Sequence, residues 1–312
     1  MYLCFLYVVL TESCDSRSNA NITTRIVPSQ CVTINDCVFW FCTCNDHGGA
    51  ISIKTGESNS VVSGTIFYSC SCGSYNGGAI YKYAGYQFDL NRVCFSQCSA
   101  GSGSSFYIDM YYWSFNICKV NLTSVNLCSK SLISSQKHSS RAICANYSVQ
   151  NFNSSNNFIY EDVSGIGFKR VENARLDFCS FSNNVGNSVI SFEMRSKNLI
   201  TYCNFISNSK STLENGVITS DESFVVKNSM FKSNSNIICK GTMTFESCSV
   251  DNMTFSGSIA TLYLQNNPTM ISHNRFSTQF CSASIYYFET IFIQKKALIS
   301  YVLFSIINTC LY

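Results

Sequence analysis

The sequence predicts an all-β solenoid in which about ten coils of parallel strands stack on one another. The main observation is a short pattern that returns along the chain at intervals of 19 to 32 residues, a period typical of solenoid repeats. The composition agrees, because β-branched and aromatic residues favour strands and only two prolines interrupt ladders that need every backbone N–H. No stretch shows a convincing 3.6-residue apolar period, so we expect no major helix.

The repeated pattern has three fixed positions: an anchor, a polar residue four positions before it and an apolar residue five positions before it. We expect the anchors to be buried and stacked in vertical register; they are Phe39, Phe67, Phe95, Leu127, Phe152, Phe181, Phe205, Phe231, Val250 and Phe276. Because side chains alternate along a strand, the apolar residue and the anchor are out of phase. A bend three residues before the anchor would turn both inward, and Asp36, Gly64 and Asn228 tolerate the left-handed backbone that it needs.

A second column follows three residues after the anchor. Its members are Cys42, Cys70 and Cys98 in the first coils and Asn184, Asn208 and Asn234 in the later ones. Equal offsets lie above one another in a parallel stack, so we expect the asparagine side chains to hydrogen-bond along the column. Cysteine is a small buried group that fits the same position.

Two motifs give the repeat a family resemblance. Gly48-Gly49-Ala50-Ile51 and Gly77-Gly78-Ala79-Ile80 follow the first two anchors, and Phe-x-x-Asn begins at Phe181, Phe205 and Phe231. Together they resemble the repeat of polymorphic outer-membrane (Pmp-type) proteins and related protist surface proteins. The resemblance covers roughly residues 31–281. It implies a single-stranded, right-handed parallel β-helix of the pectin-lyase-like kind and, since many such proteins are adhesins, a role at a surface.

Four segments are expected along the chain. Residues 1–14 hold an apolar run followed by polar residues and resemble a short signal peptide. Residues 15–30 are expected to form an N-terminal cap, residues 31–281 the β-helix, and residues 282–312 a hydrophobic C-terminal cap, because a solenoid exposes an apolar section at each end. The last segment is alternatively a membrane anchor, since Ala297 to Leu311 is apolar but a little short for a bilayer span.

Nineteen cysteines are many for a cytosolic chain and favour an oxidising compartment. Cys42 with Cys70, and Cys44 with Cys72, share offsets on adjacent coils, which places each pair about 4.8 Å apart, within the range of a disulfide. Stacked side chains point in parallel, however, so buried reduced cysteine is the alternative. Candidate N-glycosylation sites also suit an exported chain; they are Asn21, Asn121, Asn146, Asn153 and Asn252.

The charged residues and histidines argue against nucleic-acid binding, metal binding and catalysis. A net charge of +3 with no basic run does not suit a nucleic-acid partner. His47 lies near Cys42 and Cys44, but the Cys-x-Cys spacing does not suit a zinc site, and we expect no metal or cofactor. Catalytic groups on a solenoid should share offsets from successive anchors, and the charged residues do not, so we expect no catalytic residues.

Three functions remain open from the sequence. The first is a non-enzymatic, secreted or cell-surface β-helix, membrane-anchored in one version, that presents a side face to a host or cell-surface ligand, either protein or glycan. The second is a carbohydrate-active enzyme, a polysaccharide lyase or hydrolase, which would need converging carboxylates or cations in a cleft. The third is an intracellular or fragmentary copy with reduced cysteines and no present function.

Overall fold

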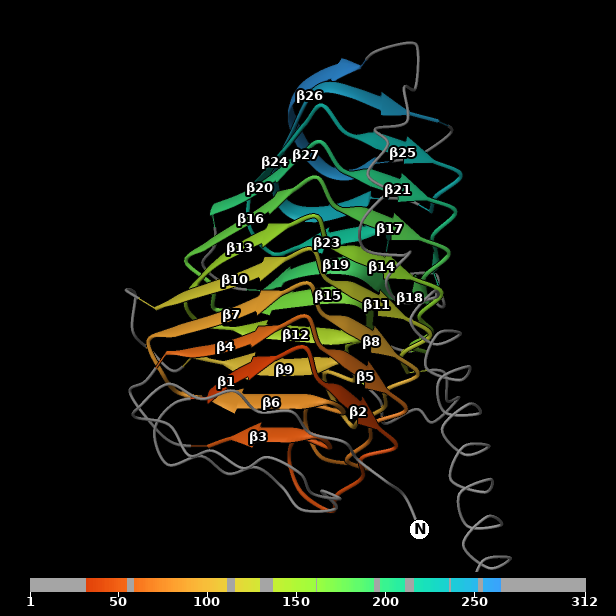
Figure 1. Ribbon diagram of the computed structural model, residues 1–312. Coiled ribbons are helices and arrows are strands. Elements are labelled where there is room, and N and C mark those ends of the chain that lie inside the picture. Colours follow the sequence, from red (N-terminus) through yellow and green to blue (C-terminus); the bar gives the residue numbers. More distant parts are fainter. Residues whose placement is uncertain are drawn as a thin grey trace, which may run out of the picture.

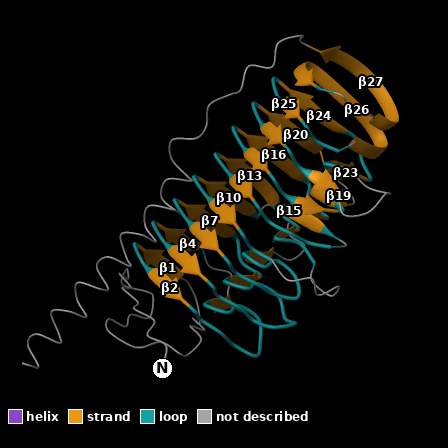
Figure 2. Ribbon diagram, turned by 90° about the vertical axis from the view of Figure 1, so that its right-hand side faces the viewer, coloured by secondary structure: helices purple, strands orange, loops and turns teal. Residues whose placement is uncertain are grey.

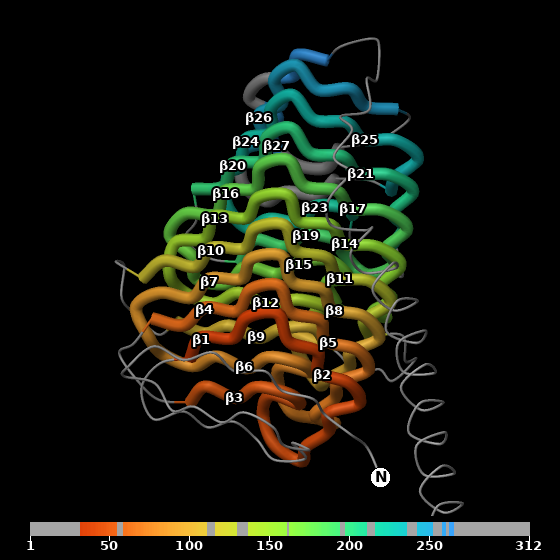
Figure 3. The backbone as a smooth tube through the Cα atoms, viewed as in Figure 1, coloured from red at the N-terminus to blue at the C-terminus, as the bar shows by residue number. Residues whose placement is uncertain are grey.

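The computed structural model describes residues 32–264, apart from 55–58, 111–115, 130–136, 161, 194–196, 211–215, 236 and 252–254. The described residues form a right-handed parallel β-helix of about seven turns, with strands and no helices (Figure 1). The tube in Figure 3 follows the chain as it winds from coil to coil. The predicted fold class is confirmed, with fewer turns than the ten expected.

Each turn contributes a strand to each of three parallel ladders, and Figure 2 shows the first ladder running along the axis. The first ladder contains β1 (Val32–Asn35), β4 (Ser60–Ser63), β7 (Gln87–Asn91), β10 (Ile117–Asn121), β13 (Asn146–Gln150), β16 (Asn173–Asp177), β20 (Lys197–Thr201) and β24 (Phe224–Lys227). The second contains β2 (Val38–Trp40), β5 (Ile66–Tyr68), β8 (Cys94–Ser96), β11 (Ser124–Asn126), β14 (Asn153–Ser155), β17 (Ser180–Ser182), β21 (Asn204–Ile206) and β25 (Met230–Lys232). The third contains β3 (Ile51–Ile53), β6 (Ile80–Tyr83), β9 (Phe106–Asp109), β12 (Ser140–Ile143), β15 (Val163–Lys169), β19 (Ser188–Glu193) and β23 (Ile218–Ser220). A separate two-stranded sheet pairs β18 (Val185–Gly186) with β22 (Ser209–Lys210).

The last described strands depart from the regular coil. β26 (Ile237–Val250) pairs in turn with β23, β24 and β25, so one long strand continues all three ladders. β27 (Phe255–Leu264) adds a parallel strand with shifts in register. Only 19 residues separate the anchors Phe231 and Val250, which leaves no room for the loops of a full coil. The tenth predicted anchor, Phe276, lies outside the described residues.

Most predicted anchors stack as expected. The pairings run Phe39 to Phe67 to Phe95 and, further along, Phe181 to Phe205 to Phe231 to Val250. The phenylalanine rings of these two runs stack with centroids 4.6 to 5.1 Å apart. All of these anchors are buried except Val250, which is partly buried. Each coil therefore buries its aromatic anchor against the coils above and below it.

Two predicted anchors are wrong by two residues. The residue in register is Val125 rather than Leu127, and Ser154 rather than Phe152. Val125 has Val120 five positions before it, so both registers fit the sequence pattern and only the ladder decides between them. Phe152 is nevertheless buried in the hydrophobic core from two positions earlier, and the small Ser154 leaves space for it. In this coil the large side chain lies two positions before the anchor position and the small one lies at it, so the total core volume is conserved.

The predicted bend between the first and second ladders is present in every described coil. One residue at each bend has a φ between 48° and 58°; these residues are Asp36, Gly64, Arg92, Leu122, Asn151, Phe178, Tyr202, Asn228 and Ser247. Only some are of the type that favours left-handed backbone, and a larger residue there costs about 1–2 kcal/mol. The coil geometry therefore overrides local preference at Arg92, Phe178 and Tyr202.

The column that follows the second ladder is longer than predicted. Correct register adds Cys128 and Asn157, so four cysteines are followed by four asparagines along one line. The Nδ2 of Asn184 donates to Asn208 Oδ1 at 3.1 Å, and the Nδ2 of Asn208 donates to Asn234 Oδ1 at 2.9 Å. The same amides also donate to backbone carbonyls of the preceding coil, as Asn208 does to Phe181 O at 2.8 Å. The predicted asparagine ladder is therefore present.

The Gly-Gly motifs turn the chain into the third ladder. Gly77 has a φ of 75°, and a Cβ there would lie 2.3 Å from Ile80 O. A Cβ on Gly78 would lie 2.1 Å from Ser104 O in the next coil. Both glycines are therefore required by close backbone approach. The corresponding left-handed position is Gly103 in the third coil and His138 in the fourth, where φ is 53°.

Candidate functional site

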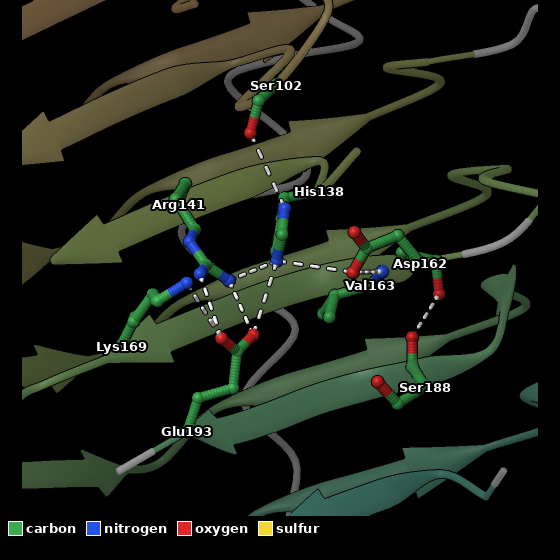
Figure 4. A network of polar contacts seen from close by, with 9 residues as sticks. Ser102, His138, Arg141, Asp162, Val163, Lys169, Ser188 and Glu193 are labelled. Carbon is green, nitrogen blue, oxygen red and sulfur yellow. Dashed lines mark hydrogen bonds and ion pairs between the residues drawn. The ribbon is translucent and has the colours of Figure 1, made fainter. Parts of the chain in front are cut away.

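A network of polar side chains lies on the third ladder, around His138 (Figure 4). His138 precedes β12, Arg141 belongs to β12, Asp162 precedes β15, Lys169 ends β15 and Glu193 ends β19. Three consecutive coils therefore contribute charged groups to one place on the outer surface. His138 and Arg141 are buried, whereas Asp162, Lys169 and Glu193 are partly exposed.

The register explains how these groups meet. Arg141 pairs with Gly167 of the next coil, and Lys169 pairs with Glu193 of the coil after that. A Cβ on Gly167 would lie 2.4 Å from the Cδ2 of His138 and 2.9 Å from the Nη1 of Arg141. Glycine in a strand marks close approach, and here it lets Arg141 cross the intervening coil to reach Glu193.

The Glu193 carboxylate is the centre of the network. Arg141 donates to it through both terminal nitrogens, Nη1 to Oε1 at 2.9 Å and Nη2 to Oε2 at 3.2 Å. The Nζ of Lys169 lies 3.6 Å from Oε2. Forked Arg–carboxylate pairs of this kind are strong and fix the orientation of both side chains.

The imidazole of His138 lies among charged and polar groups. Its Nε2 is 3.2 Å from Asp162 Oδ1 and 3.8 Å from Glu193 Oε1, and it also contacts the guanidinium of Arg141. Its Nδ1 is 3.5 Å from the Ser102 hydroxyl. The left-handed backbone of His138 costs free energy, and such strain is often found at functional sites.

The charge states follow from this geometry. Burial lowers the pKa of His138 below its ordinary value, and this outweighs the attraction of Glu193, so the imidazole is neutral at pH 7. Burial alone would raise the pKa of the Glu193 carboxyl, but hydrogen bonds from His138 and Arg141 hold it well below its usual range. Glu193 therefore stays ionised and paired with Arg141 and Lys169.

The backbone beside Ser102 has no free N–H group at Gly103 or Ser104. Ser102, His138 and Asp162 lie in the order of a nucleophile, base and orienting acid, but the backbone N–H groups of Gly103 and Ser104 already donate to carbonyls of the next coil. They cannot stabilise an oxyanion next to Ser102. Glu193 cannot act as a general acid at neutral pH, because it is ionised.

A column of aromatic rings continues from the network toward the N-terminal coils. Tyr81, Tyr107 and Arg141 follow one another in register along the outside of the third ladder. Tyr81 stacks on Tyr107 with centroids 5.7 Å apart and on His47 with centroids 4.4 Å apart. Burial, together with Tyr107 and the carboxylate of Asp109, raises the pKa of Tyr81 to about 12, so its hydroxyl stays protonated. We call Tyr81, Tyr107 and the network around Arg141 the third-ladder strip.

The expected disulfide between equal offsets is not formed. Cys44, Cys70 and Cys72 are free thiols, so no bridge joins any two of the four predicted positions. Cys70 Sγ instead donates to Tyr68 O at 3.7 Å and to Phe39 O at 3.8 Å. The thiols of Cys70, Cys98 and Cys128 in this column each point toward a carbonyl, which is the geometry that opposes a bridge between them.

The structure places three of the five candidate glycosylation sites. Asn121 and Asn146 are partly buried, and their amides hydrogen-bond to Asn91 and Asn173 respectively. Asn153 is only 7% exposed, so a glycan on its amide would not fit the wall of the helix. Asn153 is therefore the least accessible of these three sites. Asn21 and Asn252 lie outside the described residues.

Sequence reasoning missed the charged network. Arg141 and Glu193 occupy different columns two coils apart, so they do not share an offset from successive anchors. The available signal was His138 at a position that holds glycine in the first three coils. The Nδ1 of His47 accepts the N–H of Asn76 at 3.1 Å.

Comparison with known proteins identifies no relative. No family model, curated protein or solved structure matches the chain. Within the described ranges no helix is long and apolar enough to cross a membrane. The same residues contain no group of three or more His, Cys, Asp or Glu side chains that could hold a metal ion.

Proposed function

We propose that this chain is a non-enzymatic, secreted or cell-surface β-helix that binds a partner through the third-ladder strip. The proposal extends the resemblance to Pmp-type surface proteins, whose repeat shares the glycine and Phe-x-x-Asn motifs. The observation that carries it is the stacked column of Tyr81 and Tyr107, which continues into Arg141 on one outer face.

Stacked tyrosines suit binding for two reasons. Each offers an apolar ring and a polar hydroxyl, which allows contact with either a protein or a glycan surface. Stacking against a neighbour fixes the rings before a partner arrives, so little side-chain entropy is lost on association. The rigid ladder beneath them keeps the spacing of the rings constant along the axis.

The paired charges favour binding over hydrolysis or elimination. A polysaccharide lyase or hydrolase needs a carboxyl that can exchange a proton, or a cation directed at the substrate. Glu193 is instead ionised and held by Arg141 and Lys169, and Arg141 is buried. The network then fixes the shape of the strip rather than reacting.

A binding assay with face-specific variants tests the proposal. Purified protein is applied to an array of glycans and to cultured cells, and bound protein is measured by fluorescence. Tyr81→Ala and Tyr107→Ala should each weaken binding by about tenfold or more, as for central aromatic contacts. Tyr68→Ala, on the second ladder, is the matched control and should leave binding unchanged. Equal effects of all three variants, or turnover of a glycan by the wild type, would contradict the proposal.

A further inference from the structure

Seven buried cysteines share one structural role: Cys37, whose Sγ donates to Asn35 O at 3.2 Å, and six that lie in later coils. Each follows directly after a residue with left-handed backbone, and each Sγ donates to the carbonyl two residues earlier, across that bend. The six, called the corner thiols, are Cys70, Cys98, Cys128, Cys179, Cys203 and Cys248. Their Sγ to oxygen distances lie between 3.2 and 3.7 Å.

In other coils, a serine or threonine hydroxyl takes the same role at the bend between the first and second ladders. Thr65 donates to Ser63 O at 2.8 Å, Thr123 to Asn121 O at 3.1 Å and Ser229 to Lys227 O at 2.8 Å. Cysteine, serine and threonine are therefore interchangeable here as small donors. At the six corner thiols the donor is the hydrogen on sulfur, which an oxidised sulfur lacks.

The folded chain shields these thiols. All six are fully buried. Burial raises the pKa of Cys70, Cys128, Cys203 and Cys248, which keeps these groups in the unreactive thiol form. Burial also acts to raise the pKa of Cys98, but hydrogen bonds with Cys128 and Cys70 outweigh it and lower that pKa, so Cys98 is shielded by its burial alone. Several are also neighbours on adjacent coils; the backbone N–H of Cys179, for example, lies 3.4 Å from Cys203 Sγ.

We propose that the β-helix forms only while the corner thiols are reduced, and that it then protects them from oxidants. In the unfolded chain a cysteine thiolate attacks oxidised glutathione; one S–S bond forms to the cysteine, the glutathione S–S bond breaks, and one glutathione leaves as a thiolate, which takes a proton from water. The bulky adduct removes the donor and does not fit the corner. This inference is independent of the third-ladder strip and its partner.

Differential alkylation tests the protection. Protein purified without reductant is treated with light N-ethylmaleimide, then unfolded and treated with heavy reagent, and the six positions are read by peptide mass mapping. All six should carry only the heavy label. Light label within minutes at any of them, or a disulfide at any of them, would overturn the inference.

Refolding tests the dependence on reduction. Unfolded protein is diluted into buffer with either dithiothreitol or oxidised glutathione, and the protease-resistant fraction is isolated and mapped. Resistant protein should form in high yield with dithiothreitol and should carry no glutathione at the six positions under either condition. Resistant protein with glutathione on any corner thiol refutes the proposal. Because the mapping is position by position, oxidation at other cysteines does not affect the outcome.

Discussion

Truncating Phe205 tests the vertical register directly. Phe205 is fully buried, and its ring stacks on Phe181 at 5.1 Å and on Phe231 at 4.6 Å between centroids. Phe205→Ala removes the burial of one large ring, which costs about 3–5 kcal/mol with the cavity left behind. Two aromatic contacts are lost instead of one, at about 0.5–1.5 kcal/mol each, so we expect the upper half of that range. The stacked coils cannot close the gap without shifting a ladder.

Denaturant titration followed by circular dichroism measures the loss. Ile206→Ala is the matched control, since Ile206 is the next residue in β21 and is only partly buried. It should lower the free energy of unfolding by less than about 1 kcal/mol. A loss below about 1 kcal/mol for Phe205→Ala, or equal losses for both variants, would show that the register is wrong. A solenoid can unfold in parts, so a changed slope for Phe205→Ala would report that the coils had become uncoupled.

Three further outcomes follow from buried polar groups. Lys82 is fully buried and its Nζ has no hydrogen-bond partner among the described residues, and burial lowers its pKa from 10.5 to about 8. The unfolded chain then binds more protons between pH 8 and pH 10.5, so stability relative to Lys82→Met should rise across that range by up to about 3 kcal/mol; a flat difference would contradict this. Asn208→Ala should cost about 3 kcal/mol by thermal or chemical unfolding, because several buried donors and acceptors of the ladder lose their partner, whereas Lys232→Ala at an exposed position of β25 should cost little. Cys203→Ser should be less destabilising than Cys203→Ala, because only serine still donates to Thr201 O, and the reverse order would refute the donor role.

The sequence predicts which residues stack in most coils, but it does not predict the strand register in every coil. Spacing between anchors is a consequence of stacking, so the first three and the later phenylalanines could be aligned from the sequence alone. At Leu127 and Phe152 the pattern failed because each is a large apolar residue two positions from the true column, just outside β11 or β14, and the sequence spacing alone does not separate the two registers. Only backbone pairing places Val125 and Ser154 in the column. The asparagine column was predictable because stacked asparagine side chains hydrogen-bond to one another.

The candidate site could not be predicted from the repeat, because its residues are the ones that depart from the repeat. A repeated position has nearly the same surroundings in every coil, so its residue type reports stacking. His138 occupies a glycine position, Gly167 lies where Arg141 and Ser191 are its neighbours in register, and Glu193 is bound from two coils away. His138 alone costs stability through its strained backbone, Gly167 through a glycine within a strand, and Arg141 through a buried charge. Together they satisfy one another, because the glycine makes the space that lets Arg141 reach Glu193. In a solenoid, residues that break the repeat individually but stabilise one another together indicate where a binding face should be sought.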